Sequence, residues 1–127
     1  MGLSVEKCQK KHWERILEIR NSVRHSFINT SLISLDSHKG FMEKHAGDYI
    51  VAIQQGEVVG FAGVVDNDIR VAVDPNYQKL GIGKELLKKI DFQFPAATAK
   101  IDIKNLASLA LFESCGFVKE YFLLGKG

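Results

Sequence analysis

The chain has 127 residues, a length that suits one domain with a single hydrophobic core. Hydrophobic residues make up 46% of it and charged residues 25%, which is ordinary for a globular protein, and no apolar run approaches the roughly 20 residues that a membrane span requires. The net charge is +2 and the basic residues are scattered. The sequence therefore predicts neither a nucleic-acid partner nor a membrane partner, while a local basic site for an anionic ligand stays open.

Cysteine and histidine spacing bears on location and on metals. Cys8 and Cys115 show neither C-x-x-C spacing nor a disulfide framework, and the first 13 residues contain no apolar stretch of signal-peptide length. We therefore expect a cytoplasmic protein with reduced thiols. The histidines at positions 12, 25, 38 and 45 lack the spacing of metal ligands, so no metal is predicted.

The first half of the chain predicts a strand, two helices and a hairpin. Residues 3–8 can form a short strand, and apolar residues then recur on one helical face over 13–27. Ser34 is placed to cap a second helix. From position 49 the pattern changes to two apolar strands around a turn in which Gly56 can adopt a positive φ.

The second half alternates between strands and helices. In order, it predicts a strand at 69–73, a helix from Gly81, a strand at 100–104, a helix from Asn105 to Gly116 and a last strand at 117–124. This element order predicts one domain over residues 1–127 of the α/β (α+β) class. Its centre would be a mixed, mostly antiparallel sheet with helices on both faces.

The corner at residues 78–84 joins a strand to a helix through two close glycines. Helix starts carry unpaired N–H groups and a positive partial charge, glycine lets backbone approach a ligand, and Lys79 and Lys84 add positive charge. These features favour a phosphate ligand. A Walker P-loop is excluded because Gln78 stands at the first glycine position and Glu85 at the Ser/Thr position, and a dinucleotide fingerprint is excluded because Leu86 replaces its third glycine.

What remains is V-x-V-x-P-x-Y-Q-x-x-G-x-G, which resembles the acyl-CoA-binding motif of the GCN5-related N-acetyltransferase superfamily. The stretch "NLASLALFESCGF" is similar to the superfamily's second signature. The resemblance implies a GNAT-like fold and acetyl-CoA as the acyl donor. It also implies a set of cofactor-binding residues: Val71, Ala72 and Val73 beside the pantetheine, Gln78, Lys79, Leu80, Gly81, Ile82, Gly83 and Lys84 at the pyrophosphate, and Asn105 and Phe112 from the second signature.

The resemblance further implies direct attack of an amine on the thioester. A bulge would splay the central strand and leave the N–H of Val73 free as an oxyanion donor. Asp68, or its neighbour Asp66, would be the general base, unless both only form a polar turn. Phe112 stands where many members carry a tyrosine that protonates the leaving thiolate. Tyr121, Cys115 or water would then replace that acid, unless none is needed.

A weaker resemblance concerns the acceptor. Residues 18–42 are similar to bacterial nucleotide-amino-sugar N-acetyltransferases, which implies an anionic acceptor held by Arg20, Asn21, Arg24 and His38. Arg20 and His38 would alternatively be structural residues. Two other functions stay open: a protein or peptide N-terminal acetyltransferase of the ribosomal-protein type, and a non-catalytic acyl-CoA-binding module. An exposed sheet edge near the chain end would favour a homodimer.

Overall fold

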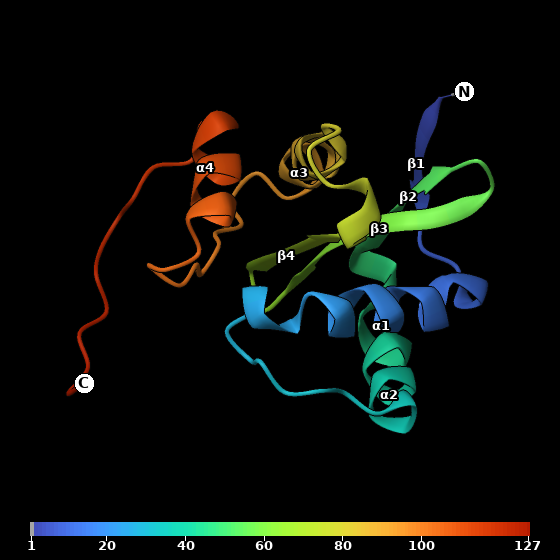
Figure 1. Ribbon diagram of the computed structural model, residues 1–127, viewed down its shortest axis with the longest axis horizontal. Helices are drawn as coiled ribbons and strands as arrows, with labels where there is room; N and C mark the ends of the chain where they lie inside the picture. Colours follow the sequence, from blue (N-terminus) through green and yellow to red (C-terminus); the bar gives the residue numbers. More distant parts are fainter. Residues whose placement is uncertain (1) are drawn as a thin grey trace.

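A four-stranded antiparallel sheet forms the centre of the computed structural model, which describes residues 2–127 (Figure 1). The strands lie side by side in chain order: β1 (Leu3–Lys7), β2 (Tyr49–Gln54), β3 (Glu57–Val65) and β4 (Asp68–Val73). Two-residue turns connect the last three strands, and all four turn residues have positive φ: Gln55, Gly56, Asp66 and Asn67. Turns of this kind match the right-handed twist of paired strands, so the hairpin predicted around Gly56 is confirmed.

Helices cover both faces of the sheet. Two of them, α1 (Trp13–Ser22) and α2 (Leu35–His45), lie on one face, and α3 (Ile82–Gln93) lies on the other with α4 (Leu106–Ser114) beside it (Figure 1). The short 3-10 helices are η1 (Lys10–His12), η2 (Arg24–Ser26), η3 (Ala46–Asp48) and η4 (Pro75–Tyr77). This arrangement confirms the predicted fold class. None of the helices within residues 2–127 is long and apolar enough to cross a bilayer.

Each face of the sheet has its own core, because side chains alternate along every strand. Ile19 and Met42 pack with Val51 and Phe61 on the α1–α2 face. On the α3 face the largest fully buried residues are Val59, Leu86, Leu87 and Ile90. Along β4 the same alternation sends Ile69, Val71 and Val73 toward α3, and Ala72 toward α1 and α2.

The predicted helix boundaries agree with the observed caps. The hydroxyl of Ser34 accepts a hydrogen bond from the amide of Ser37, and the side chain of Asn105 accepts one from the amide of Ser108. Gly116 has φ +94° just after α4, as a left-handed helix end requires. The first helix is shorter than predicted: it ends at Ser22, and η2 follows.

Two predicted strands do not form. Within residues 2–127, the segment 100–104 pairs with no strand, and β4 is bridged on this side at one position, Asp68, by Thr98 in parallel. Residues 117–124 have no regular secondary structure and run away from the body of the molecule (Figure 1), with Tyr121 to Leu124 at least 75% exposed. Alternating sequence supplies a strand pattern, but a strand forms only where a neighbour accepts its hydrogen bonds. The homodimer, which depended on an edge there, stays a prediction.

We expect Gly63→Ala to destabilise the domain by about 1–3 kcal/mol, because a Cβ atom at this position in β3 would overlap the buried ring of Tyr49. Urea unfolding measures the change. Gly40→Ala is the matched control: a Cβ at Gly40 in α2 meets nothing within 4 Å. This variant should gain up to about 1 kcal/mol from helix propensity. Equal effects of the two variants would contradict the close packing of β2 on β3.

Candidate active site

The outer edge of β4 is open over most of its length. The amide of Ile69 donates to Thr98 outside the sheet, while the amide of Asp74 donates inward to Val59 of β3. Because amides alternate along a strand, those of Val71 and Val73 point outward with that of Ile69. Neither of them has a hydrogen-bond acceptor within residues 2–127. The structure therefore leaves two backbone donors exposed at this edge.

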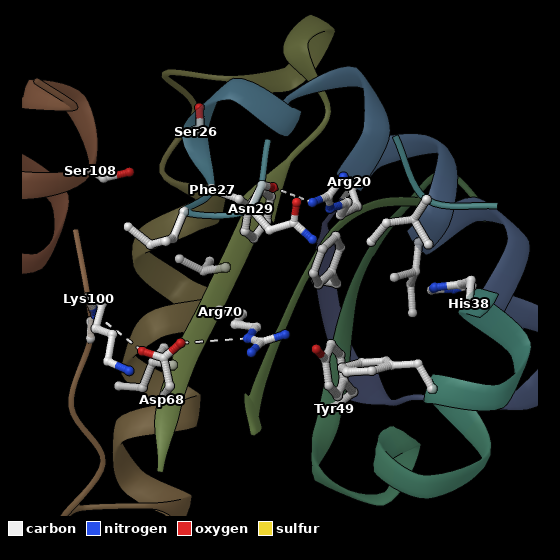
Figure 2. Close-up of a pocket in the computed structure, with 18 of the residues that line it drawn as sticks. Arg20, Ser26, Phe27, Asn29, His38, Tyr49, Asp68, Arg70, Lys100 and Ser108 are labelled. Atoms are coloured by element: carbon white, nitrogen blue, oxygen red, sulfur yellow. Dashed lines mark hydrogen bonds and ion pairs between the residues drawn. The ribbon is translucent and has the colours of Figure 1, made fainter. Parts of the chain in front are cut away.

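A cavity of about 770 Å³ adjoins this edge. This edge cavity lies between residues 68–71 of β4, residues 99–101, Ser108 and Phe112 of α4, and inward-facing residues of the stretch from Arg20 to Met42 (Figure 2). A hydrogen bond from the side chain of Asn105 to the carbonyl of Ser26 ties α4 to η2 beside it. The volume of the edge cavity is in the range of small-molecule binding sites.

The corner between η4 and α3 carries a run of unpaired amides. Within the described chain, none of the amides of residues 79–84, which we call the amide corner, donates to a backbone or side-chain acceptor. Lys79 and Gly81 both have positive φ, +67° and +82°, which turns successive amides toward the same side. A Cβ atom at Gly81 would meet nothing within 4 Å, so the backbone is open there, and the helix dipole of α3 adds positive potential. Such a corner can bind a diphosphate.

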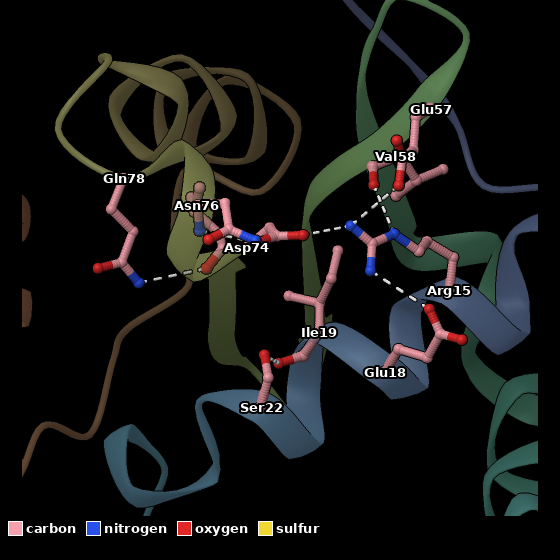
Figure 3. Close-up of polar contacts among 10 residues, drawn as sticks. Arg15, Glu18, Ile19, Ser22, Glu57, Val58, Asp74, Asn76 and Gln78 are labelled. Carbon is pink, nitrogen blue, oxygen red and sulfur yellow. Dashed lines mark hydrogen bonds and ion pairs between the residues drawn. The ribbon is translucent and has the colours of Figure 1, made fainter.

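Asp74 connects the end of β4 to this corner and is held by Arg15 of α1 (Figure 3). The guanidinium of Arg15 contacts Asp74 and Glu18, and its Nε donates to the carbonyl of Val58 at 2.9 Å. The other carboxylate oxygen of Asp74 accepts from the amide of Asn76 at 2.8 Å. Arg15 thus fixes the point at which the chain leaves β4 for the amide corner.

Asp68 lines the edge cavity. Its carboxylate accepts a hydrogen bond from the amide of Lys100 at 3.2 Å and lies 3.6 Å from Nε of Arg70 (Figure 2). Asp66, the alternative base, sits in the exposed β3–β4 turn and does not line the cavity. An ionised carboxylate beside a cavity can accept a proton from an amine that enters it.

The comparisons with known proteins agree with this geometry. The model of the acetyltransferase (GNAT) family matches residues 13–117. The chain belongs to this family. None of the curated protein sequences matches this GNAT domain. Among solved structures, it is similar to ribosomal-protein-alanine N-acetyltransferase from Brucella melitensis, with 24% identity, a TM-score of 0.79, and coverage of 89% of this chain and 83% of that one.

Two further solved structures share the fold of the GNAT domain and hold acetyl-CoA. One is a putative acetyltransferase from Salmonella typhimurium, with 21% identity, a TM-score of 0.78, and coverage of 92% of this chain and 80% of that one. The other is a phosphinothricin acetyltransferase from Sinorhizobium meliloti, with 20% identity, a TM-score of 0.78, and coverage of 91% and 75%. Because the sequence identities are only 20–24%, these similarities show that the folds are alike and nothing more.

Some sequence-predicted residues of the GNAT domain have other partners. Arg20 and His38 line the edge cavity, but Arg20 donates to the carbonyls of Asn29 and Ser31, and Nε2 of His38 pairs with the carbonyl of Trp13. Desolvation lowers the pKa of His38, which keeps it neutral. Asn21 and Arg24 do not line the cavity. Asn21 instead holds Ile33 through both its side-chain oxygen and its side-chain nitrogen.

Val71 and Val73, the β4 residues predicted to lie beside the acyl donor, have different surroundings. Val71 lines the edge cavity, whereas Val73 lies beyond it toward α3, and its carbonyl accepts from the side chain of Gln78 at 3.3 Å. No register shift occurs between β3 and β4; the irregularity lies at Ala52/Ile53 of β2. The predicted bulge of the central strand is therefore wrong, and the edge opens because residues 99–103 diverge from β4 after the single bridge at Thr98.

The predicted acids do not gather at the cavity. Tyr121 is 79% exposed in the tail, outside the residues that line the cavity, and Cys115 packs beside the α3-face core. Phe112 is buried and contacts Phe117 edge to face, with ring centroids 5.2 Å apart.

Within residues 2–127, no group of His, Cys, Asp and Glu side chains could hold a metal ion.

Sequence reasoning missed Arg70 and Tyr49, which both line the edge cavity (Figure 2). Burial raises the pKa of Tyr49 to about 12, against the opposing effect of the nearby Arg70 charge, so its hydroxyl is a neutral donor. The available signal was Arg70 itself, the single charge within the apolar run "IRVAV".

We expect Asp74→Asn to lower the free energy of unfolding by about 1–3 kcal/mol at pH 7, because it removes a charge-assisted bond to Arg15. Burial alone would raise the pKa of Asp74, but the amide of Asn76 and the Arg15 guanidinium outweigh it and hold the pKa below 3.8. The stabilisation is complete above that value and is lost as the pH falls through the lower, folded pKa. The two proteins should therefore converge in strongly acidic urea titrations.

Glu18→Gln is the control for this variant, since it removes an exposed partner of the same Arg15 and should change stability by less than about 0.5 kcal/mol. A difference between wild type and Asp74→Asn that stays constant down to the acid limit would contradict the depressed pKa of Asp74.

Proposed function

We propose that this GNAT domain transfers the acetyl group of acetyl-CoA to the primary amine of a small molecule. The observation that carries the proposal is the open edge of β4, which runs from the amide corner to the edge cavity. A diphosphate on the corner would let the pantetheine extend along this edge and bring the thioester to the cavity.

The reaction would proceed by direct attack. The amine nitrogen forms a bond to the thioester carbon, the carbonyl oxygen gains charge, and the amide of Val71 or Val73 stabilises it. Of these two residues, Val71 is nearer to the reacting groups, because Val71 lines the edge cavity and Val73 does not. Asp68 accepts the proton that the amine loses. The carbon–sulfur bond then breaks, and the CoA thiolate leaves and takes a proton from water, which requires no dedicated acid.

The cavity supports a small acceptor over a protein N-terminus. The loop from Phe27 to Ser34 lines part of the edge cavity and is held by hydrogen bonds from Arg20 and Asn21. The hydrogen bond from Asn105 to Ser26 holds α4 against η2 and so limits the width of the cavity. Relatives of this fold include both a ribosomal-protein-alanine N-acetyltransferase and a phosphinothricin acetyltransferase, so the fold does not choose between them. A nucleotide-linked amino sugar has less support, because the side-chain groups predicted to bind it are engaged within the chain or lie outside the cavity.

An acceptor panel separates these functions. Purified protein is given acetyl-CoA with small primary amines or with N-terminal peptides, and free thiol release is followed. Release with small amines supports the proposal, and release only with peptides would replace it. Calorimetric CoA binding without release from any acceptor would instead indicate a non-catalytic module.

Replacing both lysines of the amide corner should weaken CoA binding. Lys79→Gln/Lys84→Gln removes two exposed charges that form no ion pair within residues 2–127. We expect calorimetry to show a Kd increased about 3- to 30-fold, since each charge near a phosphate contributes about 0.3–1 kcal/mol at an exposed site. Lys88→Gln/Lys89→Gln, farther along α3, is the control with the same charge loss. Equal weakening by both pairs would argue against phosphate binding at the corner.

Asp68→Asn should lower kcat by about 10²- to 10⁴-fold and flatten the acidic limb of the rate profile, because the variant cannot accept the amine proton. Its affinity for CoA should stay within about twofold, since the amide corner is unchanged. Asp66→Asn, two residues away in the exposed turn, is the control and should keep the wild-type profile. Full activity of Asp68→Asn would remove this carboxylate from the mechanism.

A further inference from the structure

The edge cavity has an excess of positive charge. Three cationic side chains line it, Arg20, Arg70 and Lys100, against one carboxylate, Asp68. His38 adds no charge at neutral pH, because desolvation lowers its pKa. A cavity that is partly removed from water strengthens electrostatic interactions, so its charge selects among acceptors.

Arg20 contributes its charge, and three of its five N–H donors are used within the chain. Its guanidinium is buried, donates to the carbonyls of Asn29 and Ser31 and to the side chain of Asn21, and lies 5.3 Å above the ring of Phe27. All these partners are uncharged. The positive charge of Arg20 is therefore uncompensated, and Arg20 acts on a ligand through its field.

Arg70 has donors to offer. Within residues 2–127, its one ion pair is the approach of Nε to Asp68, at 3.6 Å, and its one side-chain hydrogen-bond partner is the hydroxyl of Tyr49. The guanidinium lies 5.8 Å from the ring centroid of Phe41, which limits its motion. Figure 2 shows it within the cavity, directed toward the hydroxyl of Tyr49. The guanidinium has five N–H groups, so those that remain beside the Tyr49 phenol can bind a carboxylate or phosphonate.

Asp68 and Arg70 are two positions apart in β4, so their side chains lie next to each other on the same face of the sheet. Their opposite charges are complementary to a molecule that carries an amine and an anionic group close together. An amine at Asp68 would lie in the edge cavity, which Val71 also lines.

We propose that the acceptor is a small amino acid-like molecule, whose anionic oxygen group binds Arg70 with help from Tyr49 while its amine binds at Asp68. This rests on the function proposed above and specifies its acceptor. Arg20 and Lys100 add to the positive field. The apolar wall formed by Ile16, Phe27, Phe41 and Met42 receives the rest of the molecule.

Matched probes test the inference. Acetylation of L-leucine, L-methionine and L-phenylalanine is compared with that of their carboxamides and their aminophosphonate analogues. We expect kcat/KM to be at least about 30-fold higher for the acid than for its carboxamide, since the carboxamide leaves Arg70 without an anionic partner. The carboxamide has the less basic amine, so more of it is neutral and reactive at pH 7, and its chemistry alone favours the opposite order. The phosphonate arm shows whether Arg70 accepts both anions or only a carboxylate.

Variants of Arg70 assign the preference to this residue. Arg70→Gln should lower kcat/KM for the amino acid about 30- to 100-fold, mainly through KM, and that for the carboxamide less than threefold. Arg70→Lys, which keeps the charge but loses the fork, should recover part of the loss. Lys39→Gln on α2, which removes an exposed charge outside the cavity, is the control. Thermal unfolding verifies that each variant is folded.

The outcomes separate this inference from the proposed function. Equal or better acetylation of carboxamides overturns the inference and leaves the acetyltransferase intact. If no amine releases thiol, the proposed function fails, and binding then decides the inference: calorimetric titration of the same probes into the CoA-saturated protein should still favour acid over carboxamide, and in Arg70→Gln it should not. An acid preference that survives Arg70→Gln unchanged overturns the role of Arg70.

Discussion

The separation of one strand edge from its neighbour is the constraint on which the rest of the site depends. The parallel contact between Asp68 and Thr98 anchors the start of β4, and beyond it the chain at 99–103 moves away. Unpaired amides in a protein interior are costly unless water or a ligand reaches them. Here Val71 lines the edge cavity and Val73 lies just beyond it, so the same divergence creates both the donors and the space that a ligand needs.

The two faces of the sheet divide the work of the site. Ile69, Val71 and Val73 pack toward α3, whose first turn belongs to the amide corner, while Asp68 and Arg70 face the side of α1 and α2. A single strand therefore borders both proposed ligand sites. Arg15 joins the two sides physically, because it reaches from α1 past β3 to Asp74, where β4 ends (Figure 3).

Much of the fold follows from local chemistry that a sequence displays. The caps at Ser34 and Asn105, the turn at Gly56 and the left-handed end at Gly116 each depend on a few neighbouring residues, and all were predicted correctly. The strands at 100–104 and 117–124 were not, because pairing depends on a distant partner. "KIDIK" alternates as well as any strand of the sheet, but nothing in the alternation says that β4 will stay unpaired beside it.

The site was predictable only in part, for a similar reason. The amide corner is a local strand-to-helix turn, and its motif lies within one short stretch. The acceptor side is assembled from residues far apart in the sequence, and spacing along the chain does not show which side chains have spare hydrogen-bonding capacity. Arg20 and Arg70 are equally cationic in the sequence. Only three-dimensional contacts reveal that the terminal nitrogens of Arg20 donate to main-chain carbonyls, whereas Arg70 pairs with side chains that line the edge cavity.

The way in which Arg20 holds its loop has an evolutionary consequence. Its hydrogen bonds to Asn29 and Ser31 end on main-chain oxygens, which every amino acid provides. Side chains at neighbouring loop positions such as Ile28 and Leu32, which face the cavity, can therefore be exchanged without removing the anchor. A lineage that carries this scaffold can explore new acceptors by single substitutions there, while the loop keeps its course.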